Sequence, residues 1–502
     1  MRDIMAVKAY KMFIDGKWVG SSTKQTFDVI NPATEAVIAK VAKGEKEDVK
    51  AAIEAARLAF DNGSWSDKTP AERAAALWKM ADLVEKNVTR FAELESMNVG
   101  KTIKYSRDSD MPFIIDNLRF FAGAARNLEG KSMGNYSGLG FSMVKREPLG
   151  VVGAIVPWNY PLYIAMWKIA PALAAGNTLV IKPASYTPLT LLEFAKLIES
   201  LLPKGVLNVV TGPGDVVGSE LASSSKVDMV ALTGDVSTGK RIMQMGSGNL
   251  KRVHLELGGK APLVIMPDAS LEAAAEGAIV SAFWNGAQDC TATTRVYVQE
   301  KMHDKLVSML VKKAAKIRIG DPMKETTDMG PLVSAKQRER AETYVKTGIE
   351  EGAKLVYGGK RPPGLKRGFY FQPTIFTDVG QGMRICQEEI FAPILSVIRY
   401  KTVGEAVEKA NDVVYGLAAS VWGSDITRTM NVAGRLKFGT VWINEHGILA
   451  SEMPHGGYKQ SGFGKDLSMY AFDEFTQIKH MYVDQTGLVR KPWYYVVYGD
   501  KE

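Results

Sequence analysis

GVVGAIVPWNYPLYIAMWKIAPALAAGNTLVIKP, residues 150–183, contains two short apolar runs rich in β-branched residues, separated by an apolar segment of helical length. Short buried strands that alternate with helices are typical of a parallel sheet with crossover helices. The stretch therefore predicts a β-strand, an α-helix and a second β-strand that runs parallel to the first.

The alternation of apolar runs with helix-length segments continues along the chain. Three similar runs follow at residues 205–212, 227–234 and 251–259, and six more at residues 261–266, 293–299, 353–359, 394–400, 417–423 and 439–444. We expect an α/β protein, with a Rossmann-like first half and a second α/β lobe that begins at residue 261.

Helical periodicity dominates earlier in the chain, at residues 47–60 and 69–97, so we expect helices to open the chain. Residues 131–149 and the aromatic tail, residues 477–502, look like strands that belong to neither lobe. They either pair with each other as a small appendage or add to a sheet edge of another subunit. We favour both arrangements together, because an exposed apolar strand promotes aggregation.

Composition excludes several classes of protein. The chain has a net charge of +8 over 502 residues, but its basic residues are dispersed, which argues against a nucleic-acid partner. No window has the apolar length of a signal peptide or a membrane span. The two cysteines, Cys290 and Cys386, form neither a disulfide framework nor a metal-binding pattern. We therefore expect a cytoplasmic protein without a metal or a membrane partner, in which Cys386 is structural.

Polar residues follow the predicted strands, at the sheet edge where ligands of parallel sheets bind. The candidates are Trp158, Asn159, Tyr160, Lys182, Ser185 and Glu256, with Gly234 and Gly239 at a strand-to-helix turn that suits a phosphate. Glycines at such turns are more often structural, and lysines after strands are usually solvated.

Cys290 ends the small and polar stretch NGAQDC, residues 285–290. Free cysteines are usually small buried hydrophobes, but this approach suits a thiol that a substrate can reach. A nucleophilic thiol needs a base and an oxyanion donor, and Glu256 and Asn159 could supply them. These patterns alone leave both interpretations of Cys290 open.

Five separated blocks favour the catalytic interpretation. The stretches VPWNYPLYIAMWKIAPALAAGNTLVIKPASYTPL, HLELGGKAPLVI, NGAQDCTATTR, EEIFAPILSV and MPHGGYKQSGFGKD resemble, in order and spacing, blocks of the aldehyde dehydrogenase superfamily. The likeness runs from about residue 10 to about residue 483, and its details look most like the γ-aminobutyraldehyde and betaine aldehyde dehydrogenases.

The resemblance implies a domain organisation and an assembly. Residues 1–130 and 150–260 would form an NAD(P)-binding domain, residues 261–476 a catalytic domain, and residues 131–149 and 477–502 oligomerisation strands and a tail. A homotetramer built as a dimer of dimers is expected by analogy.

The resemblance also implies a reaction. Cys290 would attack the aldehyde carbon, with the Asn159 side chain and the Cys290 backbone amide stabilising the oxyanion. Hydride transfer to a nicotinamide would leave a thioester, which water activated by Glu256 would hydrolyse. Lys168 and Asp466 match positions that the family links to Glu256 in proton transfer.

Cofactor positions carry over with two departures. The matching residues are Trp158, Lys182, Gly214, Gly234, Gly239, Glu389 and Phe391. Ser185 replaces a glutamate that NAD-preferring members often have, so we expect NADP to be accepted as well as NAD, and even preferred. Asp235 replaces a serine beside the pyrophosphate, and its carboxylate is expected to weaken cofactor binding by on the order of 1 kcal/mol.

The substrate is expected to be an aminoaldehyde such as 4-aminobutanal. Three residues, Tyr160, Trp167 and Trp284, match an aromatic box that holds cationic substrates, while His455 departs from the tryptophan of betaine aldehyde enzymes. Acidic candidates at the tunnel mouth are Asp110, Asp289 and Glu445. The alternative is that the aromatic residues merely line a tunnel for aliphatic, aromatic or hydroxy aldehydes such as glyceraldehyde.

Two other function classes are disfavoured. Relatives that pass the thioester to coenzyme A usually lack the glutamate that Glu256 supplies. A binding or structural relative without activity is disfavoured because Cys290, Glu256 and Asn159 are all present.

Overall fold

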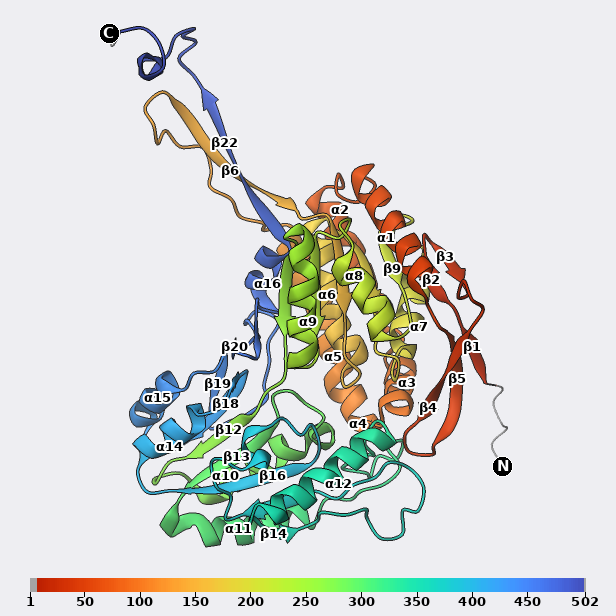
Figure 1. Cartoon of the computed structure of the whole chain (residues 1–502), viewed down its shortest axis with the longest axis vertical. Helices are drawn as coiled ribbons and strands as arrows, with labels where there is room; N and C mark the ends of the chain where they lie inside the picture. The colour runs from red at the N-terminus through yellow and green to blue at the C-terminus, as the bar shows by residue number, and fades with distance from the viewer. Residues whose placement is uncertain (1–6, 501–502) are drawn as a thin grey trace.

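Two twisted sheets, each covered by helices, form the body of the molecule, and a two-stranded arm extends away from it (Figure 1). The computed structural model describes residues 7–500. Residues 1–6 of the predicted first domain and residues 501–502 of the predicted tail lie outside this range. The two sheets confirm the predicted α/β class.

The first sheet has eight strands, of which the central five are mutually parallel. Their apolar runs are buried on both faces, as strands covered by helices on two sides must be. In sheet order the strands are β21 (Gly462–Phe463), β11 (Arg252–Glu256), β10 (Met229–Thr233), β7 (Val151–Ile155), β8 (Thr178–Lys182), β9 (Leu207–Val209), β2 (Met12–Ile14) and β3 (Lys17–Val19).

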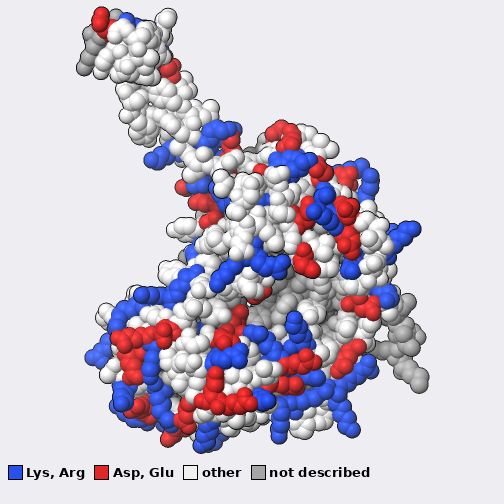
Figure 2. Space-filling view, viewed as in Figure 1, with Lys and Arg blue, Asp and Glu red and all other residues white. Residues whose placement is uncertain are grey.

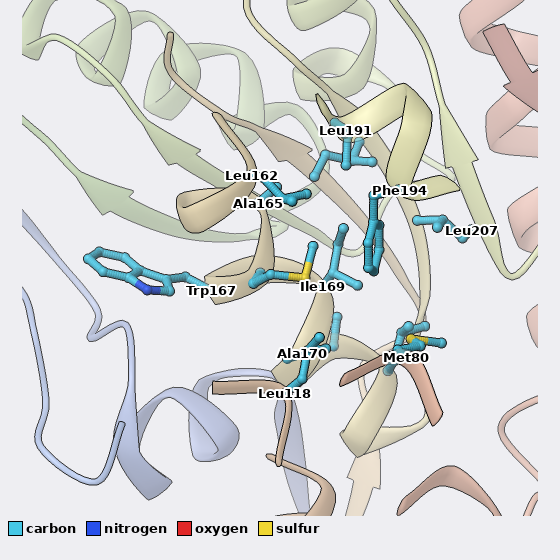
Figure 3. Close-up of a cluster of buried hydrophobic side chains, with 14 of the residues drawn as sticks. Met80, Leu118, Leu162, Ala165, Trp167, Ile169, Ala170, Leu191, Phe194 and Leu207 are labelled. Carbon is cyan, nitrogen blue, oxygen red and sulfur yellow. The ribbon is translucent and has the colours of Figure 1, made fainter. Parts of the chain in front are cut away.

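The helix between β7 and β8 is α6 (Pro161–Ala175), at the centre of the first lobe. Pro161 occupies its first turn, where the missing N–H costs nothing, and Gly176 ends it in a left-handed conformation with φ 96°. Figure 3 shows Leu162, Ala165 and Ile169 of α6 within the apolar cluster, while the ring of Trp167 lies at the edge of the same cluster. One helix thus contributes both to the core and to the site.

The second sheet has seven strands and confirms the second set of apolar runs. All pairs are parallel except that β14 pairs antiparallel at one edge. In sheet order they are β14 (Lys354–Tyr357), β15 (Thr374–Thr377), β16 (Ile394–Tyr400), β13 (Thr293–Gln299), β12 (Ala261–Ile265), β18 (Ala418–Trp422) and β19 (Thr440–Ile443).

Helices cover these sheets. Those of the first lobe are α1 (Lys46–Asp61), α2 (Pro70–Glu85), α3 (Val88–Val99), α4 (Ile103–Tyr105), α5 (Met111–Ala125), α7 (Leu189–Ile198), α8 (Ser219–Ser223), α9 (Val236–Gly246) and α16 (Ser468–Glu474). Those of the second lobe are α10 (Leu271–Phe283), α11 (Glu300–Ala314), α12 (Ala335–Glu350), α13 (Arg384–Gln387), α14 (Val403–Asn411) and α15 (Ile426–Arg435). Within residues 7–500, none of the helices is both long enough and apolar enough to cross a membrane.

The prediction that helices open the chain is wrong. Strands come first: β2 and β3 extend the first sheet, and a separate three-stranded sheet contains β1 (Lys8–Tyr10), β4 (Thr26–Asn31) and β5 (Ala36–Ala42). β1, β2 and β3 have only three residues each, too few for a clear periodicity. The helical stretch 69–97 also divides into α2 and α3 at Lys86 and Asn87.

The arm consists of β6 (Gly140–Pro148) and β22 (Thr476–Asp484), paired antiparallel along nine residues each. The predicted pairing of these two distant segments is therefore confirmed. The strand prediction for the rest of the tail is wrong, because Tyr494–Val496 forms a short turn of 3-10 helix. Figure 2 shows that the arm carries few charged side chains compared with the body.

One segment of the predicted catalytic domain returns to the first lobe. β21 pairs antiparallel with β11, so that Gly462 lies opposite Glu256. The neighbouring α16 buries Ala471 and Phe472 in the same apolar cluster as α6. This return, together with a small β17 (Tyr415–Gly416) and β20 (Tyr458–Lys459) pair, places the chain near residue 466 behind Glu256.

Candidate active site

Two cavities meet at Cys290. The larger, about 530 Å³, is lined by Trp158, Asn159, Gly234, Asp235, Glu256, Glu389 and Phe391 among others. The smaller, about 250 Å³, is lined by several aromatic residues, among them Tyr160, Trp167, Trp284 and His455. Among the residues that the structure describes, only Ile164 and Cys290 line both cavities. A molecule in either cavity can therefore reach the same thiol.

Cys290 lies in the loop between α10 and β13 and is partly exposed. Its buried surroundings raise the pKa of the thiol well above the ordinary value, and the nearby carboxylates, Asp289 first among them, raise it further. The second cysteine, Cys386, is fully buried among apolar residues of the second lobe. The thiol of Cys290 is thus reachable but held in its protonated form.

Glu256 is the last residue of β11, where the predicted strand end places it at the cavity. Its side chain is buried, and neither carboxylate oxygen has a hydrogen-bond partner among the described residues. Burial, followed by the charge of Asp466, raises its pKa well above that of an ordinary glutamate. An unbonded buried carboxyl group next to a cavity is a typical setting for proton transfer.

Lys168 and Asp466 form a fully buried ion pair, with 2.6 Å between the ammonium nitrogen and the closer carboxylate oxygen. His254 approaches the same carboxylate at 3.3 Å. Burial alone would raise the pKa of Asp466, but Lys168 and His254 lower it to about 2. The group of His254, Glu256 and Asp466 is close enough to hold a cation, and the Lys168 ammonium already provides that charge.

Asn159 lies just before α6, and its side-chain amide donates to the backbone carbonyl of Gln288 at 2.9 Å. Asn159 is buried and lines the larger cavity next to Cys290. The structure therefore brings Cys290, Glu256 and Asn159 to one cavity from three separate stretches of sequence.

Glu389 is a buried carboxylate of the larger cavity that is held by a backbone amide. Its Oε1 accepts from the backbone N–H of Gly259 at 2.9 Å. Burial raises its pKa to about 7. Trp158 and Phe391 pack edge to face in the lining of this cavity, with ring centroids 5.2 Å apart.

Four predicted cofactor residues lie outside the lining of this cavity: Lys182, Ser185, Gly214 and Gly239. Ser185 donates to the carbonyl of Gly212 at 3.0 Å, and Lys182 donates to the carbonyl of Pro183 at 2.9 Å. Burial lowers the pKa of Lys182 to about 8. Gly239 is not at the turn but inside α9. A β-carbon there would lie 2.6 Å from Leu257, so glycine is needed for the close packing of the helix against Leu257.

Asp235 lines the cavity but turns its carboxylate toward its own helix. It caps α9 by accepting from the backbone N–H of Thr238 at 3.0 Å and from the hydroxyls of Ser237 and Thr238. Burial would raise its pKa, but these hydrogen bonds lower it. The expectation that the Asp235 carboxylate weakens cofactor binding by charge repulsion did not include this helix cap. The cap spreads the negative charge over the end of α9.

α12 of the second lobe supplies residues that the sequence did not predict. Lys336, Gln337 and Arg340 line the larger cavity. Gln337 donates to the carbonyl of Phe391 at 2.6 Å, and Arg340 to that of Glu389 at 2.6 Å. α12 thereby positions the segment 389–391. Its only signal was a run of charged residues, which is usually a solvated helix face.

All four predicted substrate residues line the smaller cavity, together with Tyr105, Phe113 and Tyr163. Trp167 and His455 lie 5.1 Å apart between ring centroids, and Trp284 donates to the hydroxyl of Tyr105. Burial lowers the pKa of His455 to about 4, so this ring is neutral at physiological pH. The cavity is an aromatic tunnel with a neutral histidine.

Of the three acidic candidates, Asp289 and Glu445 line the tunnel and Asp110 does not. Asp110 is fully buried behind the tunnel wall, where it forms an ion pair with Lys101. Asp289 accepts from the Tyr160 hydroxyl at 2.6 Å and from the backbone N–H of Thr291 at 2.7 Å. Asp110 is therefore wrong as a tunnel-mouth residue.

Comparison with known proteins identifies the family. The model of the Aldehyde dehydrogenase family matches residues 18–481. Betaine aldehyde dehydrogenase of Bacillus subtilis is 46% identical over 474 residues, which cover 94% of this chain and 96% of that protein.

Solved structures agree with this match. Betaine aldehyde dehydrogenase of Staphylococcus aureus in complex with NAD+ superposes with a TM-score of 0.94 at 40% identity, covering 95% of this chain and 96% of that one. An NAD+ complex of aldehyde dehydrogenase from Bacillus cereus gives a TM-score of 0.93 at 42% identity, covering 95% of this chain and 97% of that one. The resemblance expected from the five sequence blocks is confirmed, and the chain belongs to the aldehyde dehydrogenase family.

Proposed function

We propose that this chain oxidises an aldehyde to its carboxylic acid through a thioester on Cys290, with NAD or NADP as hydride acceptor. The observation that carries this proposal is that Cys290 lies where the two cavities meet. The aromatic tunnel delivers the aldehyde to one side of the thiol, and the larger cavity holds the nicotinamide cofactor on the other.

The chain's own residues account for the covalent steps. Cys290 Sγ bonds to the aldehyde carbon and gives up its proton, while the Asn159 amide and the Cys290 backbone N–H donate to the developing oxyanion. After the thiohemiacetal carbon loses its hydride, a thioester remains. Glu256, once ionised, removes a proton from a water that attacks the thioester, and the acid leaves as the thiol is restored. Lys168 and Asp466 would pass protons to and from Glu256 at the buried end of β11.

The residues of the larger cavity fit a nicotinamide dinucleotide, which would supply a hydride acceptor when bound. Glu389 would hold the nicotinamide ribose, Trp158 and Phe391 enclose apolar surface, and Lys336 and Arg340 offer positive charge. The N-terminus of α9 at Gly234 and Asp235 suits a pyrophosphate. Lys182, Ser185 and Gly214 would meet the adenosine end outside this cavity, with Ser185 leaving room for the 2′-phosphate of NADP.

We further propose an aminoaldehyde such as 4-aminobutanal as the substrate. A carboxylate beside the reacting thiol opposes its ionisation, and Asp289 raises the pKa of Cys290 in this way. Such a charge is useful if the substrate brings a cation into the tunnel. Tyr160, Trp167 and Trp284 line the tunnel, and their aromatic rings would attract that cation. Broad oxidation of uncharged aldehydes stays the alternative.

The test is steady-state kinetics with 4-aminobutanal, butanal, betaine aldehyde, glyceraldehyde and benzaldehyde, each with NAD and with NADP. We expect wild type to prefer 4-aminobutanal over butanal by at least about tenfold in kcat/KM, or roughly 1.4 kcal/mol. Asp289→Asn should reduce that preference, and Cys290→Ala should be inactive with every aldehyde.

Matched outcomes separate the parts of this proposal. Equal rates for 4-aminobutanal and butanal, at a pH where the amine is charged, would contradict the aminoaldehyde proposal and leave general aldehyde oxidation. Turnover by Cys290→Ala would contradict the nucleophile, and a requirement for coenzyme A would contradict hydrolysis by Glu256.

A homotetramer built as a dimer of dimers is also proposed. The arm supports it, because β22 has no second neighbouring strand among residues 7–500 and exposes Ile478, Met481 and Tyr482. An unpaired apolar strand of this kind is normally covered by another chain.

A further inference from the structure

The loop that carries Cys290 contains an unusual turn. Asn285 (φ 48°, ψ 30°), Gly286 (φ 62°, ψ 32°) and Ala287 (φ 57°) follow one another in the left-handed region. Glycine adopts this region freely and asparagine tolerates it, but the β-carbon of alanine approaches the next carbonyl oxygen. Something must hold Ala287 in this conformation, three residues before the thiol.

Gln288 makes the contacts that hold the turn. Its side chain is almost fully buried, at 1% exposure. Its Nε2 donates to the carbonyl of Asn285 at 3.2 Å, across the turn. Its Oε1 accepts from the backbone N–H of Val333 at 2.8 Å. One amide group therefore closes the turn and fixes it to a distant segment.

The backbone of Gln288 joins the turn to the proposed oxyanion donor. Its carbonyl accepts from the side-chain amide of Asn159 at 2.9 Å and from that of Asn285 at 3.2 Å. Asn285 also donates to the carbonyl of Asn159 at 3.2 Å. Movement of Gln288 would thus displace both Cys290 and Asn159.

Val333 connects this arrangement to the larger cavity. It lies just before Ser334, which caps α12. From that helix Gln337 donates to the carbonyl of Phe391 at 2.6 Å. A continuous series of short contacts therefore leads from the thiol loop, through Gln288 and α12, to the segment that lines the larger cavity.

We propose that Gln288 is a positioning residue for Cys290: its amide clamps the left-handed turn of residues 285–287, compensates for the alanine at position 287, and fixes the thiol relative to Asn159. The proposal rests on the proposed role of Cys290 as the nucleophile. The buried Gln288 amide lines neither cavity and would act through the turn that it holds.

The experiment is a double-mutant cycle of Gln288→Leu and Ala287→Gly, with Gln288→Glu as the conservative variant. Two quantities are measured: kcat/KM for the best aldehyde, and the rate of Cys290 alkylation by iodoacetamide, followed by mass analysis of its peptide. Gln288→Leu should lower kcat/KM by at least about tenfold and speed alkylation by at least about threefold, because a released loop exposes the thiol. Gln288→Glu keeps the acceptor for Val333 and should fall between wild type and Gln288→Leu.

The decisive variant is Ala287→Gly combined with Gln288→Leu. Glycine adopts the left-handed turn without a clamp. Compared with Gln288→Leu alone, the double variant should therefore have at least a threefold higher kcat/KM and at least a threefold slower alkylation rate. Ala287→Gly alone should stay close to wild type in both quantities. Absence of this recovery, or a Gln288→Leu variant that behaves like wild type, would overturn the proposal. If wild type turns over no aldehyde, the proposed function fails, whereas the alkylation rates still test the clamp.

Discussion

At the scale of single residues, the site combines a thiol and a carboxyl group whose surroundings both favour the protonated form. Burial raises the pKa of Cys290 and of Glu256. A protonated thiol is protected from unwanted alkylation and oxidation, since the thiolate is the reactive form. The same burial demands that protons leave before chemistry begins, and the Lys168 and Asp466 ion pair behind Glu256 offers a route.

The raised pKa of Glu256 predicts a pH dependence for thioester hydrolysis. General-base catalysis needs the ionised carboxylate, so the hydrolysis rate should still rise with pH well above the range in which an ordinary glutamate titrates. Rapid-quench measurement of acyl-enzyme decay, after the thioester has formed, isolates this step from the titration of Cys290.

Glu256→Gln is the control for that measurement. It should slow the decay by at least about a hundredfold and remove the pH dependence. A wild-type profile that is already flat above the range in which an ordinary glutamate titrates would show instead that Glu256 is ionised at rest, contrary to its buried and unbonded setting.

The sequence identified residues whose local context is distinctive. Asn159 and Glu256 follow strong strand patterns, and Cys290 follows small polar residues. Lys336, Gln337 and Arg340 could not be found in this way, because only tertiary packing turns one end of α12 toward a cavity. Asp110 was misplaced for the same reason, since its burial behind the tunnel depends on Lys101.

At the scale of elements, α9 shows a conflict between capping and ligand binding. Asp235 satisfies the helix N-terminus that would otherwise face a pyrophosphate. Its carboxylate stabilises the helix and adds negative charge to the larger cavity. Serine at this position would retain a cap without the charge.

Two substitutions separate these effects. Asp235→Ala should lower the free energy of unfolding by about 1 kcal/mol through loss of the cap, whereas Asp235→Ser should change it little. Both should tighten NAD+ binding, by roughly fivefold for about 1 kcal/mol of relieved repulsion. Denaturant unfolding and calorimetric titration check the two quantities, and an unchanged dissociation constant in Asp235→Ser would mean that the helix amides neutralise the carboxylate.

Strong periodicity decided which elements could be predicted. Five strands of the first sheet and six of the second were found because apolar runs recur between helix-length segments, whereas the buried strand β15 was missed. β2 and β3 were missed because three residues show no period. They join the first sheet because β2 pairs with β9 and β3 pairs with β2. The turn at Tyr494–Val496 was mistaken for a strand because its residues are β-formers, while its short-range hydrogen bonds favour a helical turn.

At the scale of the whole molecule, the arm and tail expose apolar surface far from the body. Val489 is 98% exposed and Val497 is 81% exposed, in a segment that follows β22. Exposed apolar groups of this density on a projecting arm favour contact with a second copy of the chain. The predicted domain boundaries remain a prediction, and β21 shows that the chain crosses between the lobes after residue 461.

Truncation after Asp484 tests the tail. We expect the shortened chain to assemble to a smaller mass in light scattering and to unfold at a lower temperature, because the apolar tail no longer covers a neighbouring subunit. Removal of residues 501–502 alone is the matched control and should change neither quantity. An unchanged mass and melting temperature after the longer truncation would contradict a role of the tail in assembly.

The meeting of the two cavities at a single sulfur has a consequence for inhibition. Because the cavities share only Ile164 and Cys290 among residues 7–500, a compound bound in the aromatic tunnel would obstruct the proposed aldehyde path without entering the proposed dinucleotide site. Such a compound is competitive toward one reactant and indifferent to the other. Because Cys290 lines both cavities, an electrophile that reaches the thiol through either cavity would block reaction from both.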